Sequence, residues 1–285
     1  MRRRWLILGV LAIAAASIAA CGSFGPPDTS RAFEGRPAPV ERRIELPGGR
    51  SLRAFETGRV GGPLVLFVHG SPGAWNDFAY VMADPVLAER ATLVAVDRIG
   101  WGGSAAGGLE PRLREQAAAL AELLRARPER PVVVVGHSYG GPVAAQLALD
   151  APELVAAVVL VAASVDPALE DTLWWQGLGR TALVRAILPD VLRRADDEIA
   201  PLRAELEQLE PRWSQLRLPV FVQQGLDDAL VPAANADFVE RVATNTALVV
   251  ERLPDQGHLI PWERPAELSA FIQRALDAAQ AARER

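Results

Sequence analysis

From Val40 onward, short apolar runs rich in β-branched residues alternate with longer stretches whose apolar residues recur at helical spacing. Runs that are apolar throughout are typical of strands buried on both faces, as in a mostly parallel sheet whose strands are joined by helices. The pattern therefore predicts one α/β domain over residues 40–285. We expect its buried strands at 64–68, 92–96, 132–135, 156–161, 220–223 and 247–251, after an antiparallel hairpin formed by 40–46 and 51–56.

Helices are expected between these strands, at about 76–90, 111–126, 139–151, 233–243 and 265–282. One gap breaks the alternation, because the stretch at about 165–215 is mainly helical in character and has no strand signal. We interpret it as a helical cap inserted after the sixth strand. It carries Trp174 and Trp175, which either line an apolar substrate pocket or pack the cap on the core.

The N-terminus has the layout of an export signal. Arg2, Arg3 and Arg4 precede an apolar stretch too short to span a bilayer comfortably, and small residues follow it. The run Ile18-Ala19-Ala20-Cys21 resembles the lipobox of bacterial lipoproteins, in which the Cys becomes the mature N-terminus and carries lipid. The resemblance implies a signal peptide at 1–20 and a lipid anchor at Cys21, since two or more acyl chains anchor a protein stably.

This layout implies a protein that is exported to the bacterial cell envelope and held at a membrane. The alternatives are an ordinary cleaved signal, or a short anchor helix in which the Cys is incidental. Residues 21–39 are rich in Gly, Pro and Ser and show little apolar periodicity, so we expect a flexible tether there.

Charge and composition narrow the classes of partner. The formal net charge is −5, and no basic stripe interleaved with aromatic residues occurs, which argues against a nucleic-acid partner. The single Cys excludes an intramolecular disulfide, and three His without a Cys/His cluster argue against a structural zinc site.

A glycine-flanked serine follows the strand expected at 132–135. In Gly136-His137-Ser138-Tyr139-Gly140, the two glycines relieve the crowding of a sharp strand-to-helix turn that exposes a serine hydroxyl. The N-terminus of the following helix supplies free N–H groups and positive partial charge beside that oxygen. The motif predicts a nucleophile at Ser138; the alternative is a glycine-rich turn without catalysis.

With this turn, the chain resembles the α/β-hydrolase superfamily, and further segments support the resemblance in the expected order. His69-Gly70-Ser71-Pro72-Gly73 resembles the H-G-x-P-G oxyanion loop of that family. The resemblance implies that the backbone N–H groups of Ser71 and Tyr139 form the oxyanion hole, and that His69 is structural. Asp97-Arg98-Ile99-Gly100-Trp101-Gly102-Gly103-Ser104 resembles a turn that marks the fold, in which Asp97 accepts from backbone donors.

The acid and the base are expected near the C-terminus. Gly225-Leu226-Asp227-Asp228-Ala229-Leu230-Val231-Pro232 resembles the family's G-x-x-D-x-x-x-P segment, which implies that Asp228 is the acid. Asp227 and Asp166 are weaker alternatives. His258 follows the last expected strand, where the family places its base, and the chain order Ser, Asp, His is the one expected of this fold. His137 and His69 adjoin other parts of the site and are less well placed.

The resemblance implies a serine hydrolase that cleaves the carboxylic ester of a small or lipid-like substrate through an acyl-enzyme, as a carboxylesterase or lipase does, without metal or organic cofactor. A serine nucleophile points away from the epoxide hydrolases and haloalkane dehalogenases. A C–C bond hydrolase, an amidase, a lactonase or an acyltransferase would use the same triad. A membrane-tethered binding protein that has lost activity is the alternative from another class.

Overall fold

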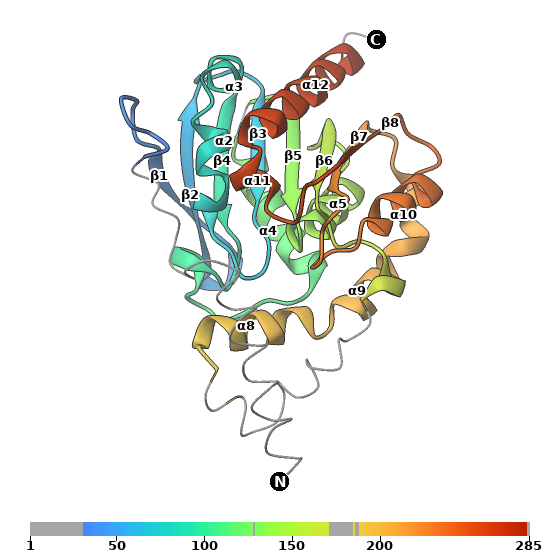
Figure 1. Ribbon diagram of the computed structural model, residues 1–285. Helices are drawn as coiled ribbons and strands as arrows, with labels where there is room; N and C mark the ends of the chain where they lie inside the picture. Colours follow the sequence, from blue (N-terminus) through green and yellow to red (C-terminus); the bar gives the residue numbers. More distant parts are fainter. Residues whose placement is uncertain (1–30, 128, 171–184, 186–187, 284–285) are drawn as a thin grey trace.

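The computed structural model describes residues 31–127, 129–170, 185 and 188–283. Its strands are β1 (Val40–Glu45), β2 (Ser51–Gly58), β3 (Leu64–Val68), β4 (Thr92–Asp97), β5 (Val132–His137), β6 (Ala157–Val161), β7 (Val220–Gly225) and β8 (Leu248–Leu253). They form one eight-stranded sheet in the order β1-β2-β4-β3-β5-β6-β7-β8 (Figure 1). β2 pairs antiparallel with β1 and with β4. All further neighbours in the sheet, from β4 through β3, β5, β6 and β7 to β8, pair in parallel. The predicted α/β class and mostly parallel sheet are confirmed.

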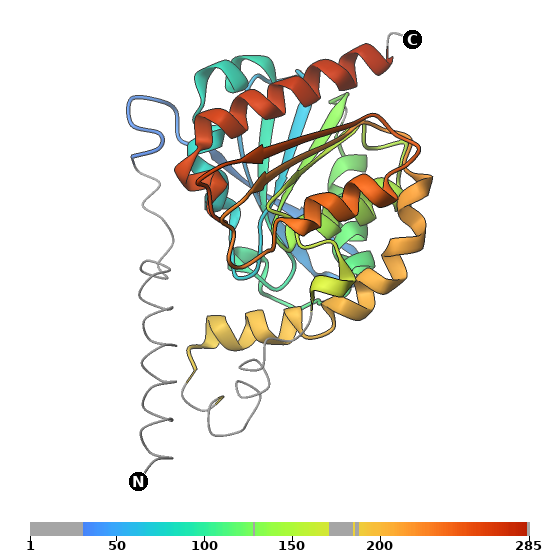
Figure 2. The ribbon, with the colours of Figure 1, turned by 45° about the vertical axis from the view of Figure 1, so that its right-hand side comes forward.

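Helices cover both faces of the sheet. One face packs against α4 (Leu113–Arg125) and α5 (Gly140–Asp150), and the other against α2 (Ala79–Met82), α3 (Pro85–Arg90) and α12 (Pro265–Arg283). Figures 1 and 2 show α12 crossing the face opposite to α4 and α5. The short helix α11 (Ile260–Glu263) precedes α12.

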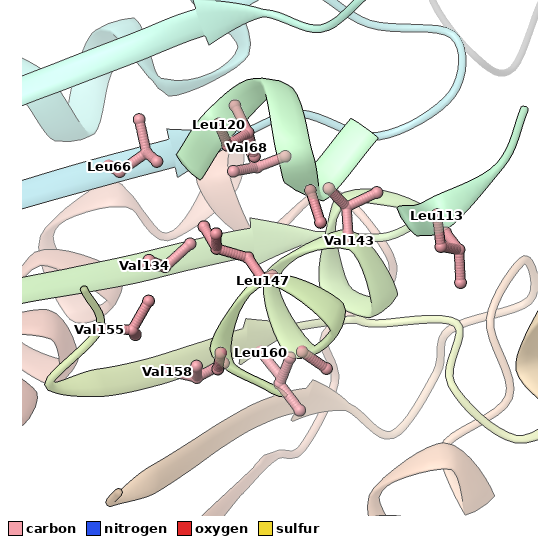
Figure 3. Close-up of a cluster of buried hydrophobic side chains, with 14 of the residues drawn as sticks. Leu66, Val68, Leu113, Leu120, Val134, Val143, Leu147, Val155, Val158 and Leu160 are labelled. Carbon is pink, nitrogen blue, oxygen red and sulfur yellow. The ribbon is translucent and has the colours of Figure 1, made fainter. Parts of the chain in front are cut away.

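Two core clusters lie on the two faces, because successive side chains of a strand point to opposite sides. In β3, Leu66 and Val68 belong to one cluster, whereas Val65 and Phe67 belong to the other. Figure 3 shows part of the first cluster, in which side chains of β3, β5 and β6 face those of α4 and α5. Central strands such as β3 and β6 are therefore apolar along their whole length, which is the pattern that made them recognisable.

The helix expected at 76–90 is interrupted, and the prediction of one continuous element was wrong. A 3-10 turn at Trp75–Phe78 leads into α2, and α3 then begins at Pro85. Pro85 has no backbone N–H to continue a helix, and the Asp84 side chain accepts from the Leu87 N–H at 2.8 Å, which caps a new helix start.

The segment between β6 and β7 is helical where the structure describes it. α8 (Asp190–Ile199) runs along the edge formed by the carboxyl ends of the parallel strands, as Figure 1 shows, and α9 (Leu202–Leu209) follows it. The segment ends in a 3-10 turn, Glu210–Gln215, whose Trp213 is buried edge-to-face against Phe238 of α10 (Ala234–Val242). The last turn of the expected cap is therefore part of the core.

The stretch expected to be a tether includes a residue that packs on the domain. Phe33 is 9% exposed and packs in the second core cluster, so contacts with the domain begin before residue 40. The proposed signal at 1–20 and Cys21 lie outside the described residues, as do Trp174 and Trp175. Among the helices of the described residues, none is long and apolar enough to cross a bilayer.

Candidate active site

Ser138 occupies a strained turn between β5 and α5. Its φ of 53° lies in the left-handed region, which non-glycine residues rarely adopt. The flanking glycines explain how the turn closes. A Cβ at Gly136 would overlap the Gly140 carbonyl, and a Cβ at Gly140 would overlap the carbonyl of Val68. The glycines thus let β5, α5 and the end of β3 approach closely around the serine.

The loop after β3 lies against Ser138. Because Val68 pairs with Gly136 in parallel register, the chain leaves β3 and β5 at the same edge of the sheet. A Cβ at Gly70 would stand 2.9 Å from Ser138 Cβ and 3.4 Å from its Oγ. Among the described residues, no acceptor receives a hydrogen bond from the backbone N–H of Ser71 or Tyr139. Both expected oxyanion donors are therefore free of protein acceptors in that part of the chain.

His258 and Asp228 are in contact. His258 Nδ1 lies 2.8 Å from Asp228 Oδ2, with 11% of the His side chain and none of the Asp side chain exposed. The other carboxylate oxygen, Oδ1, accepts from the backbone N–H groups of Leu230 at 2.9 Å and Val231 at 2.8 Å. These two donors orient the carboxylate so that Oδ2 faces the imidazole. The two loops meet because β7 and β8 are parallel neighbours.

Neither alternative acid has a hydrogen bond to His258 among the described residues. Asp227 is exposed, and its backbone N–H donates to the Gln256 carbonyl at 2.9 Å. Asp166 caps the 3-10 turn after β6 by accepting from the Ala168 N–H at 2.8 Å, and it lies 3.6 Å from Arg241. Within the described residues, Asp228 is the carboxylate that the structure brings to His258.

His137 is a neutral, structural neighbour of His258. The two rings are 4.7 Å apart, and His137 Nε2 donates to the His258 backbone carbonyl at 3.0 Å. Burial and, to a smaller extent, the nearby His258 lower the pKa of His137 to about 3. This imidazole is therefore uncharged at neutral pH and holds the loop that carries His258.

His69 and Asp97 hold loops in place, as their motifs suggested. His69 is fully buried; its Nδ1 donates to the Gly70 carbonyl at 2.7 Å, and its Nε2 accepts from the Arg98 N–H at 3.0 Å. Burial and the positive charge of Arg98 keep the pKa of His69 well below its usual value. Asp97 accepts from the backbone N–H groups of Trp75 at 2.9 Å and Gly103 at 2.8 Å.

Arg98 and Glu198 are residues of this site that the sequence analysis did not single out. They form a fully buried ion pair between the turn after β4 and helix α8, with Arg98 Nη1 2.7 Å from Glu198 Oε1. The available signal was helical spacing, because Glu198 lies three residues after Ala195 and both are on the buried face of α8. Spacing identifies a face of the helix but not the partner that the face meets.

The site has the parts needed for nucleophilic catalysis at an acyl carbon. A partly exposed serine in a left-handed turn, an imidazole bonded to a carboxylate and two backbone N–H groups without an acceptor among the described residues lie at one edge of the sheet. Among the described residues, no group of three or more His, Cys, Asp or Glu side chains could hold a metal ion.

A family model described as "alpha/beta hydrolase fold" matches residues 63–201. The chain is 27% identical over 270 residues to a protein of Pseudomonas putida named dihydrolipoyllysine-residue acetyltransferase component of acetoin cleaving system, covering 84% of this chain and 70% of that protein. A protein of the same name from Cupriavidus necator is 30% identical over 250 residues, which cover 76% of this chain and 64% of that protein. The chain thus spans less than two thirds of the second relative.

A solved structure is similar along nearly the whole chain. The crystal structure of a membrane phospholipase A, described as a bacterial virulence factor, superposes with a TM-score of 0.70 at 23% identity. The match covers 98% of this chain and 99% of that one. At this identity, the likeness shows a shared fold.

Proposed function

We propose that this chain belongs to the α/β-hydrolase superfamily, as the family model over residues 63–201 and the shared fold suggest, and that it is a serine hydrolase that cleaves a carboxylic ester through an acyl-enzyme. The observation that carries the proposal is the hydrogen bond between His258 Nδ1 and Asp228 Oδ2. A buried carboxylate that orients a partly exposed imidazole at the edge that carries a strained serine is the arrangement that activates a hydroxyl nucleophile.

The tautomer of His258 follows from the chemistry of its partner. An ionised carboxylate can only accept hydrogen bonds, so Nδ1 carries the proton in its contact with Asp228. Nε2 is then the basic nitrogen, and it takes the Ser138 proton as Oγ attacks the acyl carbon. Asp228 stabilises the imidazolium that forms, and His258 returns the proton to the leaving alcohol. Water, activated by the same nitrogen, then releases the acid.

The negative oxygen that develops during attack is stabilised by the backbone N–H groups of Ser71 and Tyr139. Both lack a described protein acceptor, and the contact between Gly70 and Ser138 brings their loops together. A donor of this kind contributes about 3 kcal/mol to lowering the barrier, because it meets the charge only as that charge develops.

The substrate class that we favour is a small or lipid-like carboxylic ester. The fold shared with a membrane phospholipase A supports an ester, and so does a serine nucleophile. The relatives named as acetyltransferase components agree loosely with the alternative of acyl transfer. C–C bond hydrolysis, amide hydrolysis and lactone opening use the same residues, and the segment between β6 and β7 would select among them.

A series of p-nitrophenyl esters from acetyl to palmitoyl tests this proposal on the full chain in detergent. We expect saturable hydrolysis with an optimum acyl length, because an acyl pocket adds a roughly constant free energy for each methylene until it is full. Activity that disappears beyond a few carbons would contradict the lipid-like substrate. A folded chain that is inert toward every ester would contradict the ester hydrolase.

We also propose that the protein is exported and anchored to a membrane by lipid at Cys21. In a bacterial host labelled with radioactive palmitate, Cys21→Ala is expected to abolish the label and release the protein from the membrane fraction, since one thiol carries the attachment. Ser23→Ala is the matched control and should remain labelled. Membrane retention of an unlabelled Cys21→Ala protein would argue against the lipid anchor.

A further inference from the structure

Arg98 is a fully buried cation that contacts the loop after β3. Its Nε donates to the His69 carbonyl at 2.9 Å, and its Nη2 donates to the Gly70 carbonyl at 2.8 Å. Burying a guanidinium is costly unless each of its donors is satisfied. Here, the Nε and Nη2 donors of Arg98 are satisfied by two consecutive carbonyls of the loop that adjoins Ser138.

Glu198 of α8 supplies the counter-charge. Its two carboxylate oxygens accept from Arg98 Nη1 at 2.7 Å and Nη2 at 2.9 Å, which is a bidentate pair. Trp101 Nε1 lies 3.0 Å from each oxygen, and Gln116 Nε2 lies 3.4 Å from Oε1. Because Glu198 belongs to the segment between β6 and β7, this contact joins α8 to the core at the edge of the active site.

The geometry of one peptide bond connects Arg98 to the expected oxyanion donor. The described cis peptide bonds are Ser71–Pro72 and Arg130–Pro131, so the bond between Gly70 and Ser71 is trans. In a trans peptide plane, the C=O and the following N–H point in opposite directions. The Gly70 carbonyl is held by Arg98 Nη2 and by His69 Nδ1. Holding this oxygen therefore fixes the direction of the Ser71 N–H on the other side of the plane.

Arg98 also touches the residue that carries the second donor. Its Cζ lies 4.7 Å from the centre of the Tyr139 ring, within the range of a cation–π contact. The Tyr139 hydroxyl donates to the Pro111 carbonyl at 2.7 Å, which holds the far end of the same side chain. The Arg98 guanidinium thus contacts both the Gly70 carbonyl, which belongs to the same peptide plane as the Ser71 N–H, and the side chain of Tyr139, whose backbone N–H is the second donor.

We propose that Arg98 is a positioning residue that fixes the direction of the two oxyanion donors. Glu198 of the cap holds Arg98 in place through their ion pair. The packing of α8 on the core therefore controls the alignment of the catalytic centre. This inference rests on the proposed function, because alignment matters only if charge develops near Ser138. A purely structural pair would need no donors to the His69 and Gly70 carbonyls, and apolar residues of similar size hold buried surfaces together equally well.

The test compares the double variant Arg98→Met/Glu198→Met with the wild type. Removing both charges leaves no unpaired ion and preserves much of the packing, so the variant should fold with a cooperative thermal transition. We expect kcat for the best ester to fall about 10- to 100-fold while KM changes by less than about 3-fold, since a small misplacement of donors affects mainly the transition state. Hydrogen–deuterium exchange should rise over residues 69–73.

Glu198→Gln and Glu207→Gln form a matched pair of single variants. Glu198→Gln removes the negative member of the pair at constant size while Arg98 can keep its donors to the two loop carbonyls, so kcat should fall by a smaller factor than in the double variant. Glu207 is half exposed and pairs with Arg203 on α9, so Glu207→Gln should leave both kcat and exchange at 69–73 unchanged. A kcat loss as large in Glu207→Gln as in Glu198→Gln would overturn the proposal.

Hydrogen–deuterium exchange over residues 69–73 distinguishes failure of the positioning role of Arg98 from failure of the proposed ester hydrolysis. If the wild type cleaves no ester but the double variant exchanges faster at 69–73, the proposed function fails and the hold of Arg98 on the loop is supported. If the wild type is active and a folded double variant retains kcat within about 2-fold, with unchanged exchange at 69–73, the positioning role is overturned.

Discussion

Replacement of Ser138 by Ala is expected to reduce kcat for any ester substrate about 10⁶-fold, close to the loss that follows removal of a whole catalytic triad. The hydroxyl oxygen is the atom that forms the acyl bond, and the neighbouring His137 is buried and already donates to the His258 carbonyl. Steady-state kinetics with the best ester of the acyl series would measure the change.

The control for this variant is its folding. Ala is as poorly suited as Ser to the left-handed backbone at φ 53°, so the thermal midpoint should change little. Covalent labelling by a fluorophosphonate should also disappear from the variant. Hydrolysis retained within about 10-fold by a folded, unlabelled Ser138→Ala protein would exclude the acyl-enzyme route.

Asp228→Asn is expected to lower kcat about 10⁴-fold by placing the imidazole proton on the wrong nitrogen. Asp228 Oδ1 accepts from two backbone N–H groups, so the amide oxygen of Asn should take that position. The amide NH₂ would then face His258 Nδ1 and donate to it. His258 would carry its proton on Nε2, where it can no longer accept the Ser138 proton.

The neighbouring carboxylate provides a matched control. Asp227→Asn makes the same chemical change one residue away, at an exposed side chain. It should retain kcat within about 2-fold, as is usual for surface changes away from the reacting groups. Equal losses in the two variants, measured with the same ester and at matched folding, would show that the acid had been assigned to the wrong residue.

The sheet and the edge that bears the site were accessible from the sequence for a physical reason. Strands such as β3 and β5 are buried on both faces, so they consist of unbroken apolar runs that differ from amphipathic helices. Each motif begins where such a run ends, and parallel strands bring their carboxyl ends to one edge. Ser138 could therefore be predicted at that edge, and the resemblance to the α/β hydrolases implied that Asp228 and His258 would join it there.

The contact between Arg98 and Glu198 could not be predicted in the same way. Arg and Glu are residue types that are normally exposed, and 100 positions separate these two in the chain. Their burial depends on how α8 is seated over the turn after β4, and no local pattern encodes that arrangement. The sequence does contain Asp196-Asp197-Glu198, but only the tertiary fold distinguishes the third member of this acidic run.

The left-handed backbone of Ser138 limits which residue types can replace it in related sequences. A β-branched residue is strained at positive φ, so threonine is a poor replacement even though it carries the same hydroxyl. Aspartate tolerates this conformation well, since its short polar side chain bonds locally. A lineage could therefore exchange hydroxyl for carboxylate chemistry by altering one residue, with the glycines and both loops around it retained.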